Sequence, residues 1–586
     1  MSATRTIARL WRDAVAKERP GPAYLVQHGD HWHEVSWTEA ATRVENMANG
    51  LLARGVQKGD AFSILAGTTL EWALFDFALA HVGAVSVGVY ANSSAKDVAY
   101  VINHSESIGV LCENADQKAK VDAERASLPA LAQVFTYDDL GALEADGAAF
   151  KAAHPTALGD AVAAVTEDDL FTLIYTSGTT GPPKGCMISN RNYYAMAAVI
   201  DHLPGYIREG DSMLLYLPLA HNFGRLMHLT GPYAGYTIAF LPDPLQTAEA
   251  LRTVRPTVLP SVPRVYEKIH TAIVSAVDES AGVKRRLADW SLAIGRDVAK
   301  REREGEPIGA ATSAKHWLAD RLILAKIRDR LGGQLRTPIS GGAPLAVEIA
   351  EFFDSIGIHI LEAYGLTECT TAATTNTPTR RKLGTVGPGL PGFELRLADD
   401  GELLIKSETV FGGYFKDPEA TADVLGADGW LRSGDIAEID DDGYVRITDR
   451  KKDIIVTAGG KNIAPQNLEN DLKTSRFISQ ALVVGDRRPY PAALVTLDAA
   501  EILKWGKARG IIGDDPSLAA HPDVNALVQT IVDEVNSERS RFEQIKRFTI
   551  LPRDFSADEG EITPTLKLKR RVVLEHFADA VESLYP

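Results

Sequence analysis

The chain has 586 residues and only three cysteines, Cys112, Cys186 and Cys369. Three cysteines are too few for a framework of disulfide bonds, and these lie too far apart in the sequence to form a zinc-binding cluster. So little cysteine in a chain of this length fits a reducing compartment best. We therefore expect the protein to be cytoplasmic.

The sequence also lacks features of export and membrane insertion. Its first twenty residues contain no apolar core followed by a small-residue cleavage site, so we expect no signal peptide. The longest apolar stretch, residues 72–91, is interrupted by Asp76, His81 and Gly83. These interruptions predict a buried helix followed by a strand rather than a membrane span.

Basic residues are fewer than acidic residues in this chain. Lys and Arg number 62 against 78 Asp and Glu, which gives a net charge of −16. Broad attraction to nucleic acid is therefore disfavoured, and anionic ligands would have to be received by basic residues placed individually. With 45% hydrophobic residues, the chain can nevertheless bury several substantial cores, as a globular protein does.

Short β-rich runs alternate with longer segments of helical spacing, which predicts an α/β layered fold. The strand candidates are residues 62–65, 85–89, 109–112, 170–175 and 358–361, the last after a helix predicted over 345–356. Residues 246–333 are predicted to be a solvent-exposed helical segment that extends from the rest of the domain, here called the helical excursion. From 384 to 443, turns rich in Gly, Asp and Pro separate short strands and predict a small β subdomain.

The charged run DRKKD at residues 449–453 lies between two apolar segments and is a predicted interdomain linker. It divides the chain into a large N-terminal domain, residues 1–448, and a small α+β C-terminal domain, residues 454–586. The large domain would combine α/β layers with the β subdomain.

The most informative segment is YTSGTTGPPKG at residues 175–185, which follows an apolar run. Its three glycines, four Ser and Thr side chains and Lys184 suit a loop whose N–H groups and hydroxyls surround phosphate oxygens. It is not a Walker A loop, because Pro183 and Gly185 stand where Gly and Ser or Thr are required.

Three other pattern matches fail. Residues 387–392 fit a dinucleotide-binding pattern literally, but two prolines and the lack of a following helix predict a turn. His33 and Glu34 begin a zinc-protease pattern whose second histidine is replaced by Trp37. No G-x-S-x-G elbow supports a serine hydrolase.

Residues 175–185 resemble the signature loop of the acyl-adenylate-forming (AMP-binding) superfamily, which includes acyl-CoA synthetases, luciferases and nonribosomal adenylation domains. Six further motifs follow in the order typical of that family. They are PLAH at 218–221, SGGAP at 340–344, EAYGLTE at 362–368, WLRSGD at 430–435, DRKKD at 449–453 and PTLK at 564–567. Residues 262–268 and 449–469 are most similar to bacterial long-chain fatty-acid CoA ligases.

The resemblance implies ATP-dependent activation of a long-chain fatty acid. The acid and ATP would give an acyl-adenylate and pyrophosphate, with Mg²⁺ as cofactor, and coenzyme A would then displace AMP. The small domain would rotate between the two half-reactions. Three alternatives stay open: a medium-chain or aryl acid as substrate, a carrier protein as acceptor, and a non-catalytic sensor of nucleotide or acyl groups.

The resemblance also assigns residues to ATP. Glu368 would ligate Mg²⁺, shared with Thr176, while Thr367 would contact the α-phosphate. His221 would lie between the nucleotide and the acyl entrance, where it would steer the carboxylate. The β- and γ-phosphates would be held by Thr176, Ser177, Gly178, Thr179, Thr180, Gly181 and Lys184. Adenosine would be bound by Gly341, Gly342, Ala343, Pro344, Tyr364 and Gly365, with Asp435 and Arg450 on the ribose.

In the C-terminal part, Lys567 would orient the carboxylate and α-phosphate, although Leu566 stands where most of the family has Gly. The hinge would lie at Asp449 to Lys452, and Gly460 with Lys461 would line the coenzyme A passage. The partners expected are small molecules and no nucleic acid. Peripheral contact with membranes and a homodimer are left open.

Overall fold

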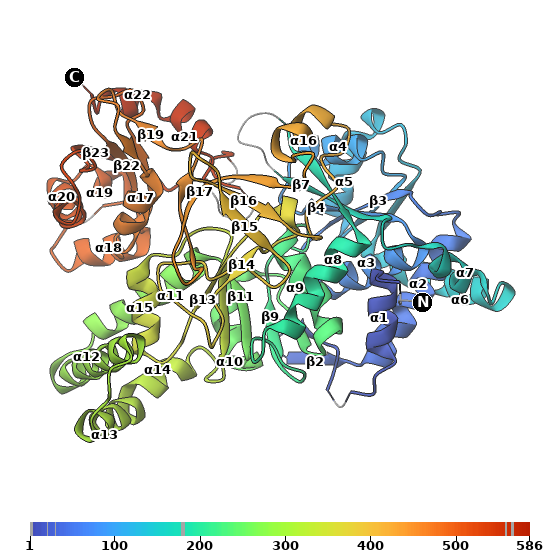
Figure 1. Ribbon diagram of the computed structural model, residues 1–586, viewed down its shortest axis with the longest axis horizontal. Coiled ribbons are helices and arrows are strands. Elements are labelled where there is room, and N and C mark those ends of the chain that lie inside the picture. The colour runs from blue at the N-terminus through green and yellow to red at the C-terminus, as the bar shows by residue number, and fades with distance from the viewer. Residues whose placement is uncertain are drawn as a thin grey trace.

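The computed structural model describes residues 4–19, 21–29, 31–176, 182–511, 513–556, 559–563 and 568–585. Figure 1 shows a large body formed by the N-terminal part of the chain and a smaller C-terminal unit at its upper left. The predicted α/β class, with a large N-terminal and a small C-terminal domain, is confirmed.

The first sheet has six strands in the order β6-β5-β3-β4-β7-β8. Neighbours from β6 to β7 are parallel, whereas β7 and β8 are antiparallel. The strands are β3 (Ala61–Ala66), β4 (Val85–Tyr90), β5 (Gly109–Cys112), β6 (Gln133–Thr136), β7 (Leu170–Thr176) and β8 (Lys184–Ser189). Every strand predicted between residues 62 and 175 is present in this sheet. Residues 72–91 form most of helix α3 (Leu70–Val82) and strand β4, as their interrupted apolar pattern predicts.

The second sheet has eight strands in the order β14-β13-β12-β11-β9-β10-β1-β2. Its inner strands are parallel, and an antiparallel strand closes each edge. They are β1 (Tyr24–His28), β2 (His31–Val35), β9 (Ser212–Leu215), β10 (Thr237–Phe240), β11 (Val258–Ser261), β12 (Thr337–Gly341), β13 (Leu361–Tyr364) and β14 (Thr374–Thr375).

Two sequence predictions need correction here. The strand predicted at 358–361 is β13, which begins only at Leu361, so the predicted loop 362–368 starts inside the sheet. The excursion at 246–333 is not wholly helical, because it contains β11 in the middle of the second sheet. A four-residue strand buried on both faces has no alternation of polar and apolar residues, so its pattern resembles a piece of helix.

Helix α9 (Asn222–Ala234) lies between the two sheets. Its residues 222–232 are buried, it packs on β9 and β10, and Arg225 reaches Thr172 of β7. Gly88 of β4 approaches the turn before α9 so closely that a Cβ there would lie 2.8 Å from the Ala220 Cα. The start of α9 is therefore fixed against both sheets.

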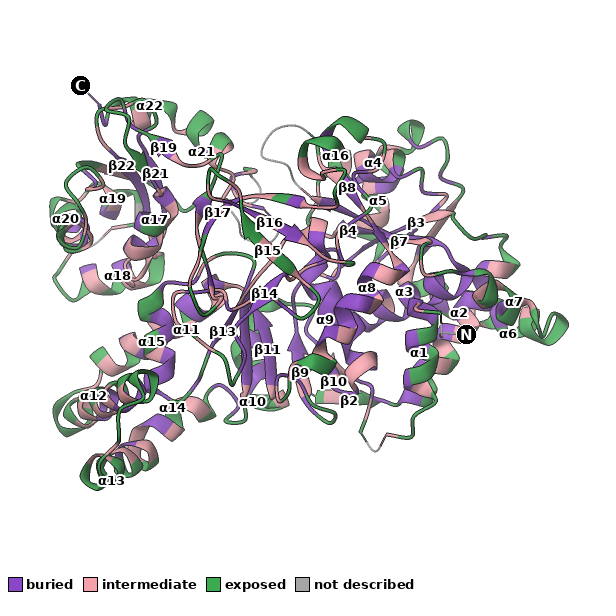
Figure 2. Cartoon of the chain, viewed as in Figure 1, coloured by how far each residue is buried: buried purple, intermediate pink, exposed green. Residues whose placement is uncertain are grey.

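The rest of the excursion is helical, as predicted. It comprises α10 (Thr247–Val254), α11 (Pro263–Asp278), α12 (Gly282–Glu304), α13 (Ala310–Ala319), a π-helical turn at Asp320–Leu324 and α14 (Ala325–Asp329). In Figure 1, α12 and α13 extend from the lower left of the body. Figure 2 shows long exposed stretches on both helices.

The predicted β subdomain is an antiparallel four-stranded sheet, β15-β16-β17-β18. Its strands are β15 (Glu394–Leu397), β16 (Glu402–Lys406), β17 (Leu431–Ile439) and β18 (Val445–Arg450). The first two residues of the predicted linker, Asp449 and Arg450, are still paired with β17. The pattern at 387–392 opens no helix, in agreement with its prediction as a turn.

The small unit follows the β hairpin of β19 (Ile455–Val456) and β20 (Asn462–Ile463). Its three-stranded sheet contains β21 (Ile478–Val484), β22 (Ala492–Leu497) and β23 (Arg547–Ile550). The helices around this sheet include α17 (Pro465–Lys473), α18 (Ala499–Lys507), α20 (Pro522–Ser537), α21 (Arg570–His576) and α22 (Ala578–Glu582). Separate hydrophobic clusters on the two faces of this sheet give the unit its own core.

The three cysteines are buried and form no disulfide. Burial raises the pKa of Cys112 and of Cys369 to about 12, and it also raises the pKa of Cys186. Among the helices described, none has both the length and the apolar composition needed to cross a membrane.

Candidate active site

The predicted phosphate loop lies between β7 and β8. Thr176 ends β7 and is paired in the ladder with Lys184, the first residue of β8. Between them, the predicted site residues Ser177, Gly178, Thr179, Thr180 and Gly181 fall outside the described part of the chain. The structure thus fixes both ends of the loop, with Lys184 Nζ 3.7 Å from Asp417 Oδ2.

Residues 411–417 pack against β8 and against Glu368. Gly412 N donates to Met187 O at 2.9 Å, Phe415 N to Gly185 O at 2.8 Å, and Phe411 N to Glu368 O at 2.8 Å. These bonds join β8 to the segment that carries Glu368. No motif in our sequence analysis marked residues 411–417, and the only local signal is a turn containing Gly412 and Gly413.

Tyr414 of this segment contacts both predicted phosphate-site groups. Its hydroxyl donates to Glu368 Oε1 at 2.6 Å, and Lys184 Nζ lies 5.0 Å from the centre of its ring. The buried ring therefore orients the carboxylate and faces the ammonium group at once. Tyr414 is a site residue that the sequence analysis missed.

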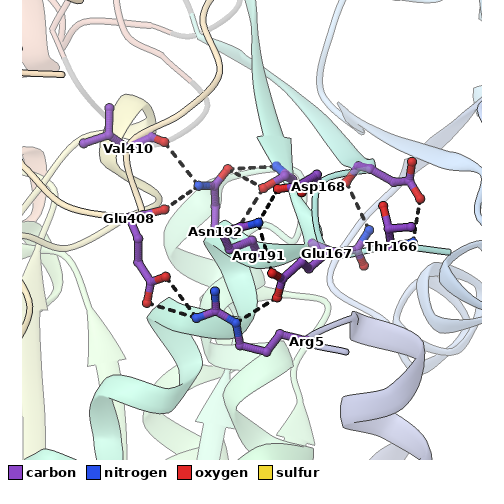
Figure 3. Close-up of polar contacts among 11 residues, drawn as sticks. Arg5, Thr166, Glu167, Asp168, Arg191, Asn192, Glu408 and Val410 are labelled. Atoms are coloured by element: carbon purple, nitrogen blue, oxygen red, sulfur yellow. Dashed lines mark hydrogen bonds and ion pairs between the residues drawn. The ribbon is translucent and has the colours of Figure 1, made fainter. Parts of the chain in front are cut away.

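Polar contacts beside α8 (Asn190–Ala198) fix the backbone just before residues 411–417 (Figure 3). Asn192 Nδ2 donates to the carbonyl oxygens of Glu408, at 2.7 Å, and Val410, at 3.2 Å. The Arg5 guanidinium bridges the carboxylates of Glu167 and Glu408, with closest distances of 2.9 Å to each. These contacts fix the position of residues 408–410, from which the segment 411–417 continues.

Thr367 and Glu368 lie in a short 3₁₀ turn (Thr367–Cys369) after β13. The following residues, Thr370 and Thr371, have φ of 55° and 95°, a left-handed conformation that costs a non-glycine residue free energy. A Cβ at Gly365 would lie 1.9 Å from the Thr371 carbonyl oxygen, so this tight turn requires glycine. Strain of this kind often marks a functional loop.

Asn222 connects this turn to α9. Its Nδ2 donates to Thr367 O at 3.4 Å, its carbonyl accepts from Thr371 Oγ1 at 3.2 Å, and its Oδ1 accepts from the Tyr193 hydroxyl. The predicted steering residue His221 comes directly before it and caps α9, with Nδ1 accepting from Phe223 N at 3.2 Å. A neutral His221 therefore carries its proton on Nε2. Asn222 is the second residue that the sequence analysis missed.

The residues predicted for adenosine also converge. Tyr364 ends β13, and its hydroxyl donates to Asp435 Oδ2 at 2.6 Å. Asp435 of β17 is paired with Arg450 of β18, whose Nε lies 3.6 Å from Oδ1. Burial is the main cause that raises the Tyr364 pKa. The predicted adenine edge begins at the last residue of β12 and continues into the following loop, with Gly341, Gly342, Ala343 and Pro344.

One carboxylate beside a phosphate loop fits Mg²⁺ that takes its other ligands from ATP and water. The Cys186 thiol is buried near both predicted ligands, because Glu368 raises and Thr176 lowers its pKa beside the larger effect of burial. Within the described residues, no cluster of three or more His, Cys, Asp or Glu side chains forms a closed metal site. The donor set fits a metal that arrives with the nucleotide.

The predicted hinge begins in a buried environment. Asp449 is 2% exposed, and its carboxylate accepts from Arg450 N at 2.6 Å and from Gln466 N, at the start of α17, at 3.4 Å. Burial raises its pKa to about 6. Lys452, the predicted pivot, is exposed.

Gly460 and Lys461 lie in the exposed turn between β19 and β20. Lys461 Nζ is 5.7 Å from the centre of the Phe542 ring. Phe542 helps to line a cavity of about 420 Å³, together with Thr457, Pro489, Tyr490, Arg541, Lys546 and Arg547. This combination of cationic and aromatic side chains lies wholly within the small unit. Our sequence analysis identified only Lys461 beside it.

Lys567, with the rest of its motif at 564–566, lies outside the described residues. Its described neighbours Ile562 and Leu568 form an antiparallel bridge. Arg570 Nη1 bonds to Glu469 at 2.5 Å, and the Arg570 pKa is raised by Glu469, Asp453 and Asp449 against the effect of burial. The start of α21 is thus close to the predicted hinge.

Comparison with known proteins gives matches over nearly the whole chain. The AMP-binding enzyme family model matches residues 12–415, and the AMP-binding enzyme C-terminal domain matches residues 452–586. The long-chain-fatty-acid–CoA ligase FadD15 of Mycobacterium tuberculosis is 39% identical, covering 97% of this chain and 95% of that protein. The long-chain-fatty-acid–CoA ligase ACSBG2 of Xenopus laevis is 30% identical, covering 99% and 84%.

Solved structures share the fold. The adenylation domain of a carboxylate reductase from Mycobacterium chelonae has a TM-score of 0.76 at 23% identity, covering 99% of this chain and 91% of that one. The anthranilate CoA ligase AuaEII in complex with anthranoyl-AMP has a TM-score of 0.73 at 18% identity, covering 99% of both. On its two family matches and its full-length relatives, the chain belongs to the AMP-binding enzyme family.

Proposed function

We propose that the protein is a Mg²⁺-dependent, AMP-forming ligase that converts a long-chain fatty acid to its acyl-CoA through an acyl-adenylate. One observation carries the proposal. Tyr414 contacts both Lys184, the first residue of β8, and Glu368, and Asp435 contacts both Tyr364, the last residue of β13, and Arg450. The substrate class rests on the names of the full-length relatives.

In the first half-reaction, a carboxylate approaches an α-phosphate of the same charge, so charge neutralisation is the main task. We assign Lys184 and the loop after Thr176 to the β- and γ-phosphates, and Thr367 to the α-phosphate. Glu368 and Thr176 would hold Mg²⁺, which supplies positive charge to the phosphate oxygens. His221, with its Nε2–H directed by the cap of α9, would orient the acid.

Adenosine binding follows from the second group of residues. The Asp435 carboxylate suits the two vicinal ribose hydroxyls because one carboxylate accepts from both. Tyr364 is held by its bond to Asp435, and its ring would offer a stacking face to adenine. Arg450 would add a ribose contact from the neighbouring strand.

For the second half-reaction, we propose that the cavity beside Lys461 receives the nucleotide end of coenzyme A. Lys461, Arg541, Lys546 and Arg547 would bind its phosphates, and Phe542 or Tyr490 would stack on its adenine. In the described part of the chain, no hydrogen bond or ion pair joins Gly460 or Lys461 to the large domain. Rotation of the small domain about Lys452 would bring them to the acyl-adenylate.

The test is a titration of the purified protein with carboxylic acids of increasing chain length, with and without coenzyme A. We expect AMP and acyl-CoA in equal amounts, with the largest kcat/KM for long-chain acids. A best substrate of medium chain length or an aryl acid would change the substrate class. Acyl-AMP that coenzyme A fails to release would favour a carrier-protein acceptor. Absence of ATP–pyrophosphate exchange with every acid would favour a sensor.

Replacement of Lys567 tests the separate roles of the two half-reactions. Lys567→Ala should reduce acyl-adenylate formation by about a hundredfold or more, yet leave thioester formation from supplied acyl-AMP within a few-fold of wild type. Lys569→Ala, two residues away, is the matched control and should leave both rates near wild type. An equal loss in the two half-reactions would contradict the assignment of Lys567.

We further propose that the enzyme works in the cytoplasm and meets its substrate at membrane surfaces. Long-chain acids partition into bilayers, so peripheral contact would give the acyl site direct access to them.

A further inference from the structure

The hairpin of α12 and α13 exposes an apolar face that the packing of the hairpin does not use. On one side, Ala319 and Leu324 are fully buried, and the Leu324 side chain lies beside Gly295 of α12. On the other side, Trp317 is 62% and Leu318 is 43% exposed. Removing these two side chains would leave the buried side of the hairpin intact.

Basic side chains accompany this face. The Arg321 guanidinium lies 5.7 Å from the centre of the Trp317 ring, Lys315 is exposed one turn before Leu318, and Lys326 is exposed in the following helix α14. Within the described residues, none of these three cations forms an ion pair with a carboxylate. An indole with neighbouring cations is the combination that proteins place at the boundary between lipid headgroups and acyl chains.

The hairpin, together with the π-helical turn and α14 that follow it, has a charge of opposite sign to that of the chain. These residues, 282–330, contain twelve Lys and Arg against seven Asp and Glu, a net charge of +5, whereas the chain carries −16. Because the rest of the molecule is repelled by an anionic surface, the hairpin is the part that would face it. In Figures 1 and 2 the hairpin extends away from the body with α13 outermost.

We propose that the face formed by Lys315, Trp317, Leu318 and Arg321 docks the protein on membranes that contain anionic lipids. This proposal rests on the proposed function only for its purpose, since a bilayer is where a long-chain acid is concentrated. The π-helical turn at Asp320–Leu324 begins inside this face and carries Arg321. Trp317 and Leu318 would enter the headgroup region, and the cations would pair with lipid phosphates.

Sedimentation with vesicles tests the docking without ATP or acid. The full-length protein should bind vesicles of equimolar phosphatidylglycerol and phosphatidylcholine, and bind phosphatidylcholine vesicles at least tenfold more weakly. The double variants Trp317→Ser/Leu318→Ser and Lys315→Glu/Arg321→Glu should each lower the partition coefficient on anionic vesicles about tenfold or more. The first loss should persist at high salt, whereas the second should shrink.

Matched controls use exposed residues elsewhere. Leu245→Ser/Leu397→Ser removes apolar side chains that are 90% and 39% exposed, and Lys96→Glu/Lys507→Glu reverses two exposed charges. Both controls should bind vesicles like wild type. All variants should keep wild-type turnover with acid supplied in detergent, which separates docking from the proposed function.

Failure of the wild-type protein to bind anionic vesicles would overturn the proposal and leave a protein partner as the occupant of this face. Equal binding by wild type and both hairpin variants would also overturn it, because the contact would then lie elsewhere. Loss of turnover in detergent would instead show that the hairpin supports catalysis.

Discussion

Tyr414 shows how a side chain outside the motifs controls one within them. Its hydroxyl bonds to one oxygen of Glu368, and its ring faces the ammonium group of Lys184. A single residue therefore orients both the carboxylate and the ammonium group that would lie at the nucleotide phosphates. Partners that orient a metal ligand commonly change metal affinity or activity ten- to a hundredfold.

We predict that Tyr414→Phe raises the Mg²⁺ concentration for half-maximal ATP–pyrophosphate exchange about tenfold, because Glu368 loses its hydrogen bond. Binding of Mn²⁺ to the ATP complex, followed by electron paramagnetic resonance, should weaken by a similar factor. Tyr444→Phe is the control, since that ring packs beside the exposed Arg380 and Lys382. Unchanged Mn²⁺ affinity in Tyr414→Phe would show that Tyr414 does not act through the metal ligand.

Glu362 gives a prediction about pH. Burial raises its pKa to about 8, whereas a glutamate in the unfolded chain has a pKa of about 4.5. Between about pH 4.5 and 8 the folded protein therefore binds more protons at this residue than the unfolded chain does. The free energy of unfolding should fall as the pH rises through that window.

Glu362→Gln removes this titration. We expect the variant to be more stable than wild type at pH 8.5, by on the order of 2 kcal/mol, and to lose that advantage at pH 5. Urea unfolding of the two proteins at both pH values measures it. A difference that is the same at pH 5 and pH 8.5 would mean that Glu362 does not titrate in this range.

The residue scale also shows what sequence can predict. Glu368 and Asp435 could be predicted as site residues because each is a defined chemical group within a motif of known order. Tyr414 and Asn222 were not, because their roles come from partners far away along the chain, which only the packing of the segments brings together.

At the scale of elements, a buried ion pair joins α3 to α9. Arg225 bonds to Asp76 and, at 2.6 Å, to Thr172 Oγ1, and all three side chains are fully buried. Near them, Trp72 Nε1, Arg225 Nε and both ring nitrogens of His228 are buried and have no hydrogen-bond partner among the described residues. Such a cluster costs desolvation free energy, so it fixes the position of α9 rather than adding stability.

We predict that Asp76→Ala destabilises the large domain by about 3–5 kcal/mol, because it leaves the Arg225 charge buried and unpaired. Asp76→Ala/Arg225→Met should recover most of that loss. Asp13→Ala, which breaks the exposed pair with Arg9, should cost less than about 0.5 kcal/mol. Urea unfolding measures all three variants, and a double variant as unstable as Asp76→Ala would argue against an unpaired charge as the cause.

Helices and strands were predicted correctly where the spacing of apolar residues fitted only one of the two, and wrongly where it fitted both. Strands β3, β4, β5 and β7 stand out because turns and helices separate them. Asp76 was read only as an interruption of an apolar stretch, since its partner Arg225 lies 149 positions further along the chain. Strand β11 is too short for its pattern to be distinguished from the helices beside it.

At the scale of the whole molecule, charges join the small domain to α11 and the residue after it. Arg476 Nη1 lies 2.7 Å from Asp278 Oδ2, and Lys473 Nζ lies 3.7 Å from Glu267 Oε1. Glu501 accepts from Ser275 Oγ at 2.7 Å, and Lys504 pairs with Glu279. This set of polar contacts defines an interface that salt should weaken.

We predict that Arg476→Glu loosens this interface, because it replaces a cation between Asp278 and Glu501 by a third carboxylate. The radius of gyration from solution scattering should rise, and proteolytic cleavage at the predicted linker 449–453 should be several-fold faster. Lys507→Glu, on the same helix as Lys504, is the control. Wild-type scattering and cleavage in Arg476→Glu would mean that other contacts hold the small domain.

The buried cysteines have a practical consequence for work with this protein. Coenzyme A carries a free thiol. Its consumption can be followed with an aromatic disulfide reagent, which releases a coloured product when thiolates react with it. Because Cys112, Cys186 and Cys369 are buried and their thiolates are disfavoured, the native protein should contribute almost no colour of its own. Colour that develops in the absence of coenzyme A would then report unfolding directly.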